Sequence, residues 1–134
     1  MSKLNVEIVT PERRLTQVTA DEVIAPGAVG LFGVRPGHTA YLSVLQPGPL
    51  TVREGAISTI YFVSGGFVEA GPLAVRVLAD SAELASTIDV PAAQKRMAEA
   101  ETKLKALEPT DPKGDEQRTI IVREKRRIEV SALK

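Results

Sequence analysis

The chain has 134 residues, with 17 acidic and 17 basic side chains, and 43% of its residues are apolar. This length allows one domain with a small appendage and excludes two full-sized domains. The composition is typical of a folded protein rather than a disordered one. The chain has no cysteine and a single histidine, His38, which excludes disulfides, thiolate zinc sites, cysteine nucleophiles and two-histidine metal motifs. No apolar run reaches the roughly 18 residues of a membrane span, so we expect no membrane insertion.

The first 90 residues alternate short apolar runs with Gly and Pro turns, at the spacing typical of an antiparallel sandwich or barrel. Alternation is clearest at Leu73, Val75 and Val77, which we expect to share one buried face. The glycines at 27, 30, 33 and 37 do not match the dinucleotide-binding motif, and we interpret them as a backbone turn. We predict seven to nine strands, including residues 4–8, 22–25, 41–45, 50–53, 57–63, 67–69 and 73–78.

Near residue 80 the composition changes to strong helix formers. Asp89 is a suitable N-cap, and Pro91 is tolerated in the first turn of a helix because no hydrogen bond is lost there. Apolar residues then recur at steps of three and four, which predicts a helix with an apolar seam that packs within the chain. The seam consists of Val90, Ala93, Met97, Ala100, Leu104 and Leu107.

A second helix is predicted from about Asp115 to Lys134, after a polar turn that contains Pro109 and Pro112. The four β-branched residues at 119–122 lower its intrinsic stability. A helical wheel places Ile121, Ile128 and Ala132 on one face and Arg123, Arg126 and Arg127 on the opposite face.

Charge follows the same division: residues 1–90 carry six basic and nine acidic groups, whereas residues 113–134 carry seven basic and four acidic groups. We therefore expect the C-terminal segment to favour an acidic partner surface. The predicted fold class is a β-sandwich N-terminal domain, residues 1–87, followed by a C-terminal α-helical hairpin, residues 88–134.

Motifs for catalysis are missing from this sequence. It has neither a phosphate-binding Gly-Lys-Ser/Thr motif nor a nucleophile elbow, so we expect no enzyme, and no metal or cofactor. His38, after Pro36 and Gly37, is interpreted as a turn residue. The Lys125 to Arg127 cluster is either a solvated helix face or a protein-binding surface. Nucleic acid is disfavoured because the total charge is zero and the segment has no aromatic residue for stacking.

Four sequence blocks occur in order. They are Gly30 to Leu42 (GLFGVRPGHTAYL), Leu45 to Gly48 (LQPG), Val63 to Glu69 (VSGGFVE) and Val77 to Asp80 (VLAD). With the helical tail that follows, they resemble the epsilon subunits of F-type ATP synthases. The resemblance covers residues 3 to 90, and the tail has the length and character of the family's tail.

The resemblance implies a rotor subunit of the central stalk, which couples the gamma subunit to the c ring during proton-driven ATP synthesis. In that family the C-terminal helices fold onto the sandwich or extend into the catalytic head of alpha and beta subunits, where they inhibit ATP hydrolysis. The corresponding location is the cytoplasmic side of a bacterial inner membrane, as a peripheral protein.

The resemblance also assigns sites by position. A c-ring-facing loop corresponds to Ala28, Val29, Gly30, Leu31, Phe32 and Gly33. The gamma contact corresponds to His38 and Ser43, and the inhibitory basic face to Arg123, Arg126 and Arg127, with Lys125 and Arg118 as further candidates.

Some members of the family bind ATP through a motif at the start of the first tail helix. The corresponding positions here are Ile88, Asp89, Ala92 and Ala93. Alanine replaces the motif's arginine at position 92, and Glu99 stands where a later arginine is expected, although Glu83 and Asp89 remain. Because a guanidinium supplies charge-assisted donors to phosphate, we expect no tight ATP site.

Two alternatives remain at this point. A free-standing β-sandwich adaptor with a basic helical tail would bind some other acidic protein. A small-molecule enzyme would need a deep pocket around His38, and nothing in the composition requires one.

Overall fold

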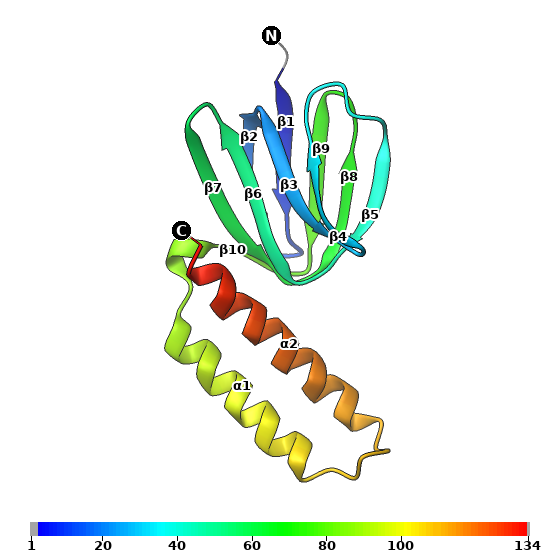
Figure 1. Ribbon diagram of the computed structural model, residues 1–134, viewed down its shortest axis with the longest axis vertical. Coiled ribbons are helices and arrows are strands. Elements are labelled where there is room, and N and C mark those ends of the chain that lie inside the picture. The colour runs from blue at the N-terminus through cyan, green and yellow to red at the C-terminus, as the bar shows by residue number, and fades with distance from the viewer. Residues whose placement is uncertain (1–2, 134) are drawn as a thin grey trace.

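The computed structural model describes residues 3–133, which form ten strands, one short 3-10 helix (η1) and two α-helices (Figure 1). The predicted β-sandwich followed by a helical hairpin is confirmed. The strands are β1 Leu4–Val9, β2 Arg14–Ala20, β3 Glu22–Gly27, β4 Gly30–Val34, β5 Tyr41–Leu45, β6 Gly48–Glu54, β7 Ile57–Val63, β8 Gly66–Ala70, β9 Ala74–Ala79 and β10 Ala82–Leu84. The helices are η1 Ala85–Thr87, α1 Val90–Lys105 and α2 Lys113–Ser131.

The strands form one continuous sheet that folds over to make two layers. The hydrogen-bonded order is β10-β7-β6-β3-β5-β8-β9-β1-β2, and β4 pairs with β3. Strands β3 and β5 pair only at Gly27 and Leu45 within the described residues, so the sheet turns the corner between its layers there. Strand β1 runs parallel to β9, and the other pairings are antiparallel.

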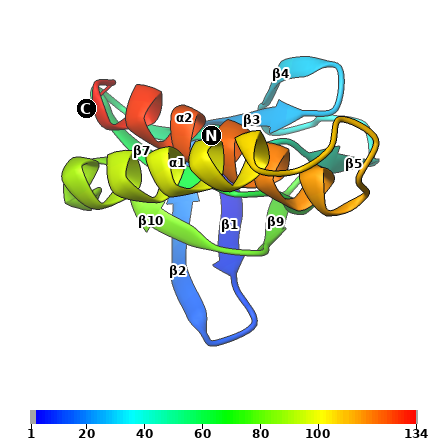
Figure 2. The ribbon, with the colours of Figure 1, turned by 90° about the horizontal axis from the view of Figure 1, so that it is seen from below.

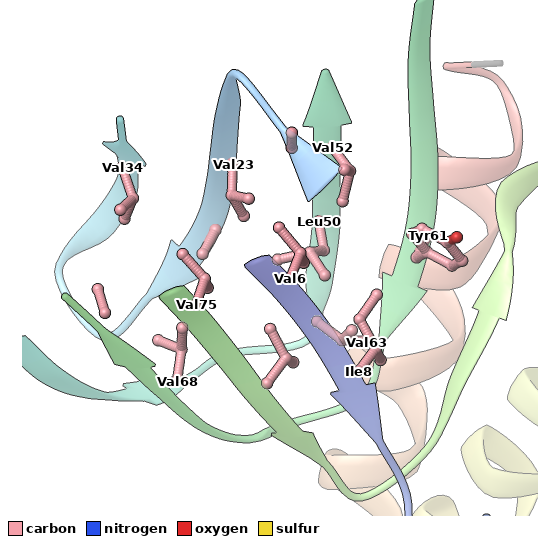
Figure 3. Packing of buried hydrophobic residues seen from close by; sticks show 14 of the residues in the cluster. Val6, Ile8, Val23, Val34, Leu50, Val52, Tyr61, Val63, Val68 and Val75 are labelled. Atoms are coloured by element: carbon pink, nitrogen blue, oxygen red, sulfur yellow. The ribbon is translucent and has the colours of Figure 1, made fainter. Parts of the chain in front are cut away.

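The core lies between the two layers. Alternate side chains of both layers point into one interior (Figure 3), as a strand's period of two requires. Leu4, Val6 and Ile8 from β1 are fully buried, as are Val23 from β3 and Leu50 from β6. Of the residues expected to alternate in β9, Val75 and Val77 are buried. Leu73 precedes the strand and is exposed, which corrects the prediction for that residue.

Three strands were missed or misread in the sequence. Strand β2 buries only Ala20 fully, so its sequence lacks a clear apolar period. The Gly-rich segment that we interpreted as a turn forms most of a β-hairpin, because β3 pairs with β4 from Val23 opposite Val34 to Gly27 opposite Gly30. Strand β10 has three residues, which is too short for a periodic signal.

Helix α1 begins with the cap that its sequence favours, whereas α2 begins at Lys113, two residues before the predicted start and without a side-chain cap. Asp89 is the N-cap of α1, and its Oδ1 accepts a hydrogen bond from the backbone N–H of Ala92 at 3.1 Å. The predicted seam faces α2, with Ala93 and Ala100 buried. Helix α2 spans its β-branched segment without a break, since packing against α1 outweighs the weak propensity there. Residue 134, the predicted end of this helix, lies outside the described residues.

Helix α2 packs on two sides, which the helical wheel did not anticipate. One side faces α1, and the C-terminal half also contacts β6, β7 and η1 of the sandwich. Figure 2 shows both helices across the base of the sandwich. Val130 is buried with Phe62 and Ala85 on this second side. Ala132, expected on the apolar face, is instead the exposed C-cap.

Glycine is required at position 66, where β8 begins beside β9. Gly66 has φ of 122°, and a Cβ there would lie 2.9 Å from the Cα of Ala79 and even closer to the carbonyl oxygen of Leu78. We expect Gly66→Ala to lower the free energy of unfolding by about 2 kcal/mol or more, because it adds strain and a backbone clash. Urea denaturation followed by circular dichroism measures this.

Gly71→Ala is the matched control, because a Cβ there would come no closer than 3.8 Å to another residue. Its effect should stay within about 0.5 kcal/mol. Equal destabilisation by both substitutions would contradict the steric argument.

Candidate interaction surfaces

An apolar strip crosses the outer face of the sandwich. Paired residues of neighbouring strands point to the same side of a sheet, and the pairing aligns Val44 with Phe67, Phe67 with Leu78, and Leu78 with Val9. Phe67 and Val44 are each 51% exposed, and the other two are partly buried. We call these four residues the apolar row. It runs over β5, β8, β9 and β1, which lie side by side in Figure 1.

A second, mostly charged row lies next to it on the same face. Its members, aligned by the same pairings, are Leu42, Glu69, Arg76 and Glu7. Arg76 Nε lies 3.1 Å from Oε1 of Glu7, while Leu42 at the end of the row is 65% exposed. The face therefore places an apolar row beside a mostly charged row, and protein interfaces commonly combine apolar and polar contacts in this way.

The two residues predicted to contact gamma have different settings. Ser43 is buried, and its hydroxyl donates to the carbonyl oxygen of Val44 at 3.1 Å, so Leu42 and Val44 on either side present the exposed side chains. His38 is half-buried in the loop before β5. Its Nδ1 lies 2.5 Å from the carbonyl oxygen of Thr39, and its ring is 6.5 Å from that of Tyr41. This is the turn role that we predicted for it.

The segment predicted to face the c ring is the tip of the β3–β4 hairpin. Ala28 and Val29 form the turn, with Val29 98% exposed, and Leu31 on β4 is 62% exposed. Phe32 folds back against Gly27, where a Cβ would lie 2.8 Å from its ring. The side-chain amide of Gln46 donates to the carbonyl oxygen of Ala28 and ties the turn to the sandwich.

The residues next to the tip of this hairpin and α2 share one surface groove. Arg126 and Glu129 of α2 line it from one side, and their ion pair has an N–O distance of 2.8 Å. The other wall comes from the β3–β4 hairpin, the turn before β6 and the start of β6, with Pro26, Gly27, Gly30, Leu31, Gln46, Pro47, Gly48 and Pro49.

The positions of the degenerate ATP motif have structural roles here. Ile88 packs against the cluster of Phe62 and Val130, Asp89 caps α1, and Ala93 is fully buried in the helix seam. Ala92 is half-buried beside them. Glu83, the nearby acidic residue, accepts a hydrogen bond from Arg127.

The sharpest electrostatic feature is a buried carboxylate between the two helices. Glu124 is 0% exposed, and its Oε1 accepts hydrogen bonds from Nε of Arg96 on α1 at 2.9 Å and Nε of Arg127 at 3.1 Å. Its Oε2 accepts from Nε of Arg123 at 2.8 Å. We call Glu124, these three arginines and Glu83 the Glu124 cluster.

The arginines determine the charge state of Glu124. Burial by itself would raise its pKa, but the hydrogen bonds from Arg123 and Arg96, with the charge of Arg127, outweigh burial and hold the pKa below the ordinary value. Glu124 is therefore ionised at neutral pH.

The predicted basic face is divided in this structure. Arg127 is 14% exposed and points toward the sandwich, and Arg123 turns to Glu124, whereas Arg126 is exposed and pairs with Glu129. The three arginines thus do not form one solvated face. The wheel misplaced Arg127 because it assumed that α2 packs on one side only.

The sequence reading also missed Arg96 and Glu124. A signal was available, since Ile121, Glu124 and Ile128 continue the steps of three and four that define a buried seam. A glutamate at such a position, with arginines one residue before and three residues after it, indicates a buried ion-pair cluster.

No helix within residues 3–133 is long and apolar enough to cross a membrane. Among these residues, no group of three or more His, Cys, Asp or Glu side chains is arranged to hold a metal ion.

Comparisons with known proteins place the sequence among ATP synthase subunits. The family "ATP synthase, Delta/Epsilon chain, beta-sandwich domain" matches residues 3–85. The ATP synthase epsilon chain of Myxococcus xanthus (strain DK1622) is 52% identical over 128 residues, which are 96% of this chain and 94% of that protein. The epsilon chain of Anaeromyxobacter sp. (strain Fw109-5) is 41% identical over 96% of this chain and 97% of its own length.

Solved structures with the same fold also exist. A chain in the mitochondrial ATP synthase OSCP/F1/c-ring structure of Euglena gracilis superposes with a TM-score of 0.82 at 20% identity, covering 100% of this chain and 83% of that one. A chain in the Tetrahymena thermophila central stalk and c-ring structure gives a TM-score of 0.68 at 18% identity, with 97% of both chains covered. At these identities the likeness establishes the fold.

The low pKa of Glu124 leads to a pH prediction. Glu124→Gln leaves three arginines without their carboxylate and should cost about 3 kcal/mol of stability at pH 7. A carboxylate whose pKa is lower in the folded state than in the unfolded state, where it is about 4.3, stabilises the fold fully above the unfolded value. This stabilisation is lost as the pH falls through the lower, folded value. The difference in free energy of unfolding between the unchanged protein and Glu124→Gln should therefore become smaller below about pH 4.

Denaturant unfolding of both proteins between pH 3 and 7 measures this difference. Comparing the two at each pH cancels the titration of the other carboxylates. A difference that is constant across the range would contradict an ionised, arginine-stabilised Glu124.

Proposed function

The chain belongs to the epsilon-subunit family of F-type ATP synthases, and from this premise we propose that it is a non-catalytic part of the rotating central stalk. In this proposal the sandwich links the gamma subunit to the c ring, and the tail, residues 88–134, inhibits ATP hydrolysis. Family membership confirms the resemblance found in the sequence and favours this function over a free-standing adaptor.

The apolar row is the observation that carries the proposal. A sandwich that buries one side of each layer needs no apolar residues on the outside, yet Phe67 and Val44 are half exposed and paired side by side on β8 and β5. Covering such side chains contributes roughly 1 kcal/mol for each half-exposed residue. Together with the polar row beside it, this face suits a partner held for many turnovers, and we assign it to gamma.

The β3–β4 hairpin suits the c-ring contact for a different reason. Its tip carries the most exposed apolar side chain of the described residues, Val29, on a turn fixed by the Gln46 bond. A short, braced turn can present a fixed contact to a partner at little entropic cost. Leu31 adds a second apolar side chain on the same hairpin.

The tail has the charge that inhibition requires. Arg123, Arg126 and Arg127 remain the residues that we assign to an acidic segment of the catalytic head, with Lys125 and Arg118 as further candidates. In the compact state described here, all three form ion pairs within the chain, and Arg127 also pairs with Glu83 of the sandwich, so its contact with the head requires α2 to leave the sandwich.

As part of the ATP synthase complex the protein is membrane-associated. We propose the cytoplasmic side of a bacterial inner membrane, by analogy with the bacterial relatives. We propose no bound cofactor, because the ATP-motif arginine is replaced by Ala92.

A charge placed in the apolar row should disrupt gamma binding. Phe67→Asp puts a carboxylate at the centre of the row, and we expect at least a tenfold loss of affinity for gamma, because an unpaired charge would be covered on binding. Titration calorimetry with purified gamma measures the affinity.

Ile57→Asp is the matched control, because Ile57 is 72% exposed at the start of β7 in the other layer. It should bind gamma as the unchanged protein does. If Phe67→Asp binds gamma normally, the assignment of this face is wrong.

Removing the tail tests inhibition. Deletion of residues 88–134 should raise ATP hydrolysis by the reassembled enzyme several-fold while the sandwich still copurifies with gamma, because the gamma face lies outside the tail. Unchanged hydrolysis in a complex that retains the shortened chain would remove the regulatory part of the proposal and leave the structural part.

A further inference from the structure

We propose that the Glu124 cluster holds the tail on the sandwich and withholds Arg123 and Arg127 from acidic partners, so that Glu124 and Glu83 compete directly with the acidic surface that the tail would bind. This inference rests on the proposed inhibitory function, since it names the contact that regulates it.

A glutamate without solvent exposure is costly unless charged donors replace its water. Arg96, Arg123 and Arg127 supply those donors to both oxygens of Glu124. Since Arg96 belongs to α1 and the other two to α2, the carboxylate also joins the two helices. The hairpin is thereby fixed as a unit, and Glu124 cannot be exposed without breaking contacts from both helices.

Arg127 extends the cluster to the sandwich. Its Nη1 donates to Oε1 of Glu83 on β10, and its guanidinium lies 4.7 Å from the ring centroid of Phe62 on β7. One side chain thus makes an ion pair, a cation–π contact and a hydrogen bond to Glu124 at the same time. It is the residue through which the helix pair and the sandwich are electrostatically connected.

The other contacts between α2 and the sandwich are few, so the cluster has a large influence. The apolar part consists of Val130 against Phe62 and Ala85, with Ile60 and Ile88 at its edge. Because this apolar contact is small, the docking of α2 on the sandwich is sensitive to the ion pairs.

The cluster also defines what kind of partner can replace it. It contains two carboxylates and three guanidiniums, so the arginines are largely neutralised while the tail is docked. A partner must offer carboxylates at similar spacing, because arginines that leave Glu124 and Glu83 for a neutral surface would lose charge-assisted hydrogen bonds. An acidic protein segment meets this requirement.

The isolated full-length chain allows a direct test, because it has no cysteine of its own. A fluorophore pair would be attached through Ser58→Cys on β7 and Ala132→Cys at the end of α2, two exposed positions beside the groove that contains Leu133. Energy transfer is high when α2 is docked and falls when it leaves.

Glu83→Gln removes the carboxylate on the sandwich and leaves the contacts between the helices in place. Glu124→Gln removes the central carboxylate. We expect each to lower energy transfer and to increase binding of poly-L-glutamate, an acidic probe, by about tenfold. Glu129→Gln is the control, because Glu129 is an exposed acid on the same helix that pairs with Arg126 outside the cluster; its energy transfer should stay unchanged.

Circular dichroism separates release from unfolding. If Glu124→Gln loses helix content, the test depends on Glu83→Gln alone, because that variant keeps the Arg96–Glu124 contact between the two helices. Unchanged energy transfer and unchanged poly-L-glutamate binding in Glu83→Gln overturn the proposal.

Failure of the proposed inhibitory function can be distinguished from failure of this inference. If the tail is released in Glu83→Gln but the reassembled enzyme hydrolyses ATP at the same rate with this variant and with the deletion of residues 88–134, the cluster holds the tail and the inhibitory role is wrong. If the deletion relieves inhibition while Glu83→Gln leaves energy transfer unchanged, the tail is inhibitory but the Glu124 cluster does not hold it on the sandwich.

Discussion

The carboxylate of Glu124 is the group on which the arrangement of the C-terminal helices depends. The carboxylate is fully buried and is ionised at neutral pH. A buried charge is favourable here because guanidinium groups donate hydrogen bonds to both of its oxygens. Those groups come from two helices, and one of them also contacts the sandwich. A single acidic side chain therefore links three parts of the fold that otherwise touch through small apolar contacts.

The two parts of the chain differ in how they are stabilised. The sandwich has a continuous apolar interior with contributions from nine of its strands or their ends, so no single side chain controls it. The helix pair instead combines a narrow seam rich in alanine with a few concentrated charge interactions. Apolar packing degrades gradually when residues change, whereas a buried charge cluster fails when one member is lost. This contrast suits a rigid binding domain joined to a detachable regulatory segment.

The sequence predicts the sandwich and the helices well where one period dominates. Strands β5 and β7 have the predicted bounds, and α1 has the predicted cap and seam. The failures have physical causes. Strand β4 is rich in glycine, which weakens any strand signal, and β2 has little burial of its own. Helix α2 is buried on two sides, so a wheel with one apolar face assigns Arg127 to solvent.

The surfaces that we propose for partners were only partly visible in the sequence. The resemblance pointed to Ser43, and the structure shows exposed apolar side chains on its neighbours Leu42 and Val44 and on Phe67 of β8, which pairs with Val44. Such a row becomes visible only when strand register is known, because its members are far apart in the sequence. Glu124 was overlooked because an acidic residue among arginines resembles an ordinary solvated helix surface, and only its place in the seam distinguishes it.

The groove shared by α2 and the β3–β4 hairpin has a mechanical consequence. Arg126 and Glu129 line one side of this groove, and Pro26, Pro47 and Pro49 line the opposite side. If α2 leaves the sandwich, as the proposed inhibitory contact requires, Arg126 and Glu129 leave with it, and the prolines beside the tip of the hairpin become exposed to water. The underside of the sandwich would then have a different contour and charge in its two states, so a neighbour resting on it could sense which state the helices occupy.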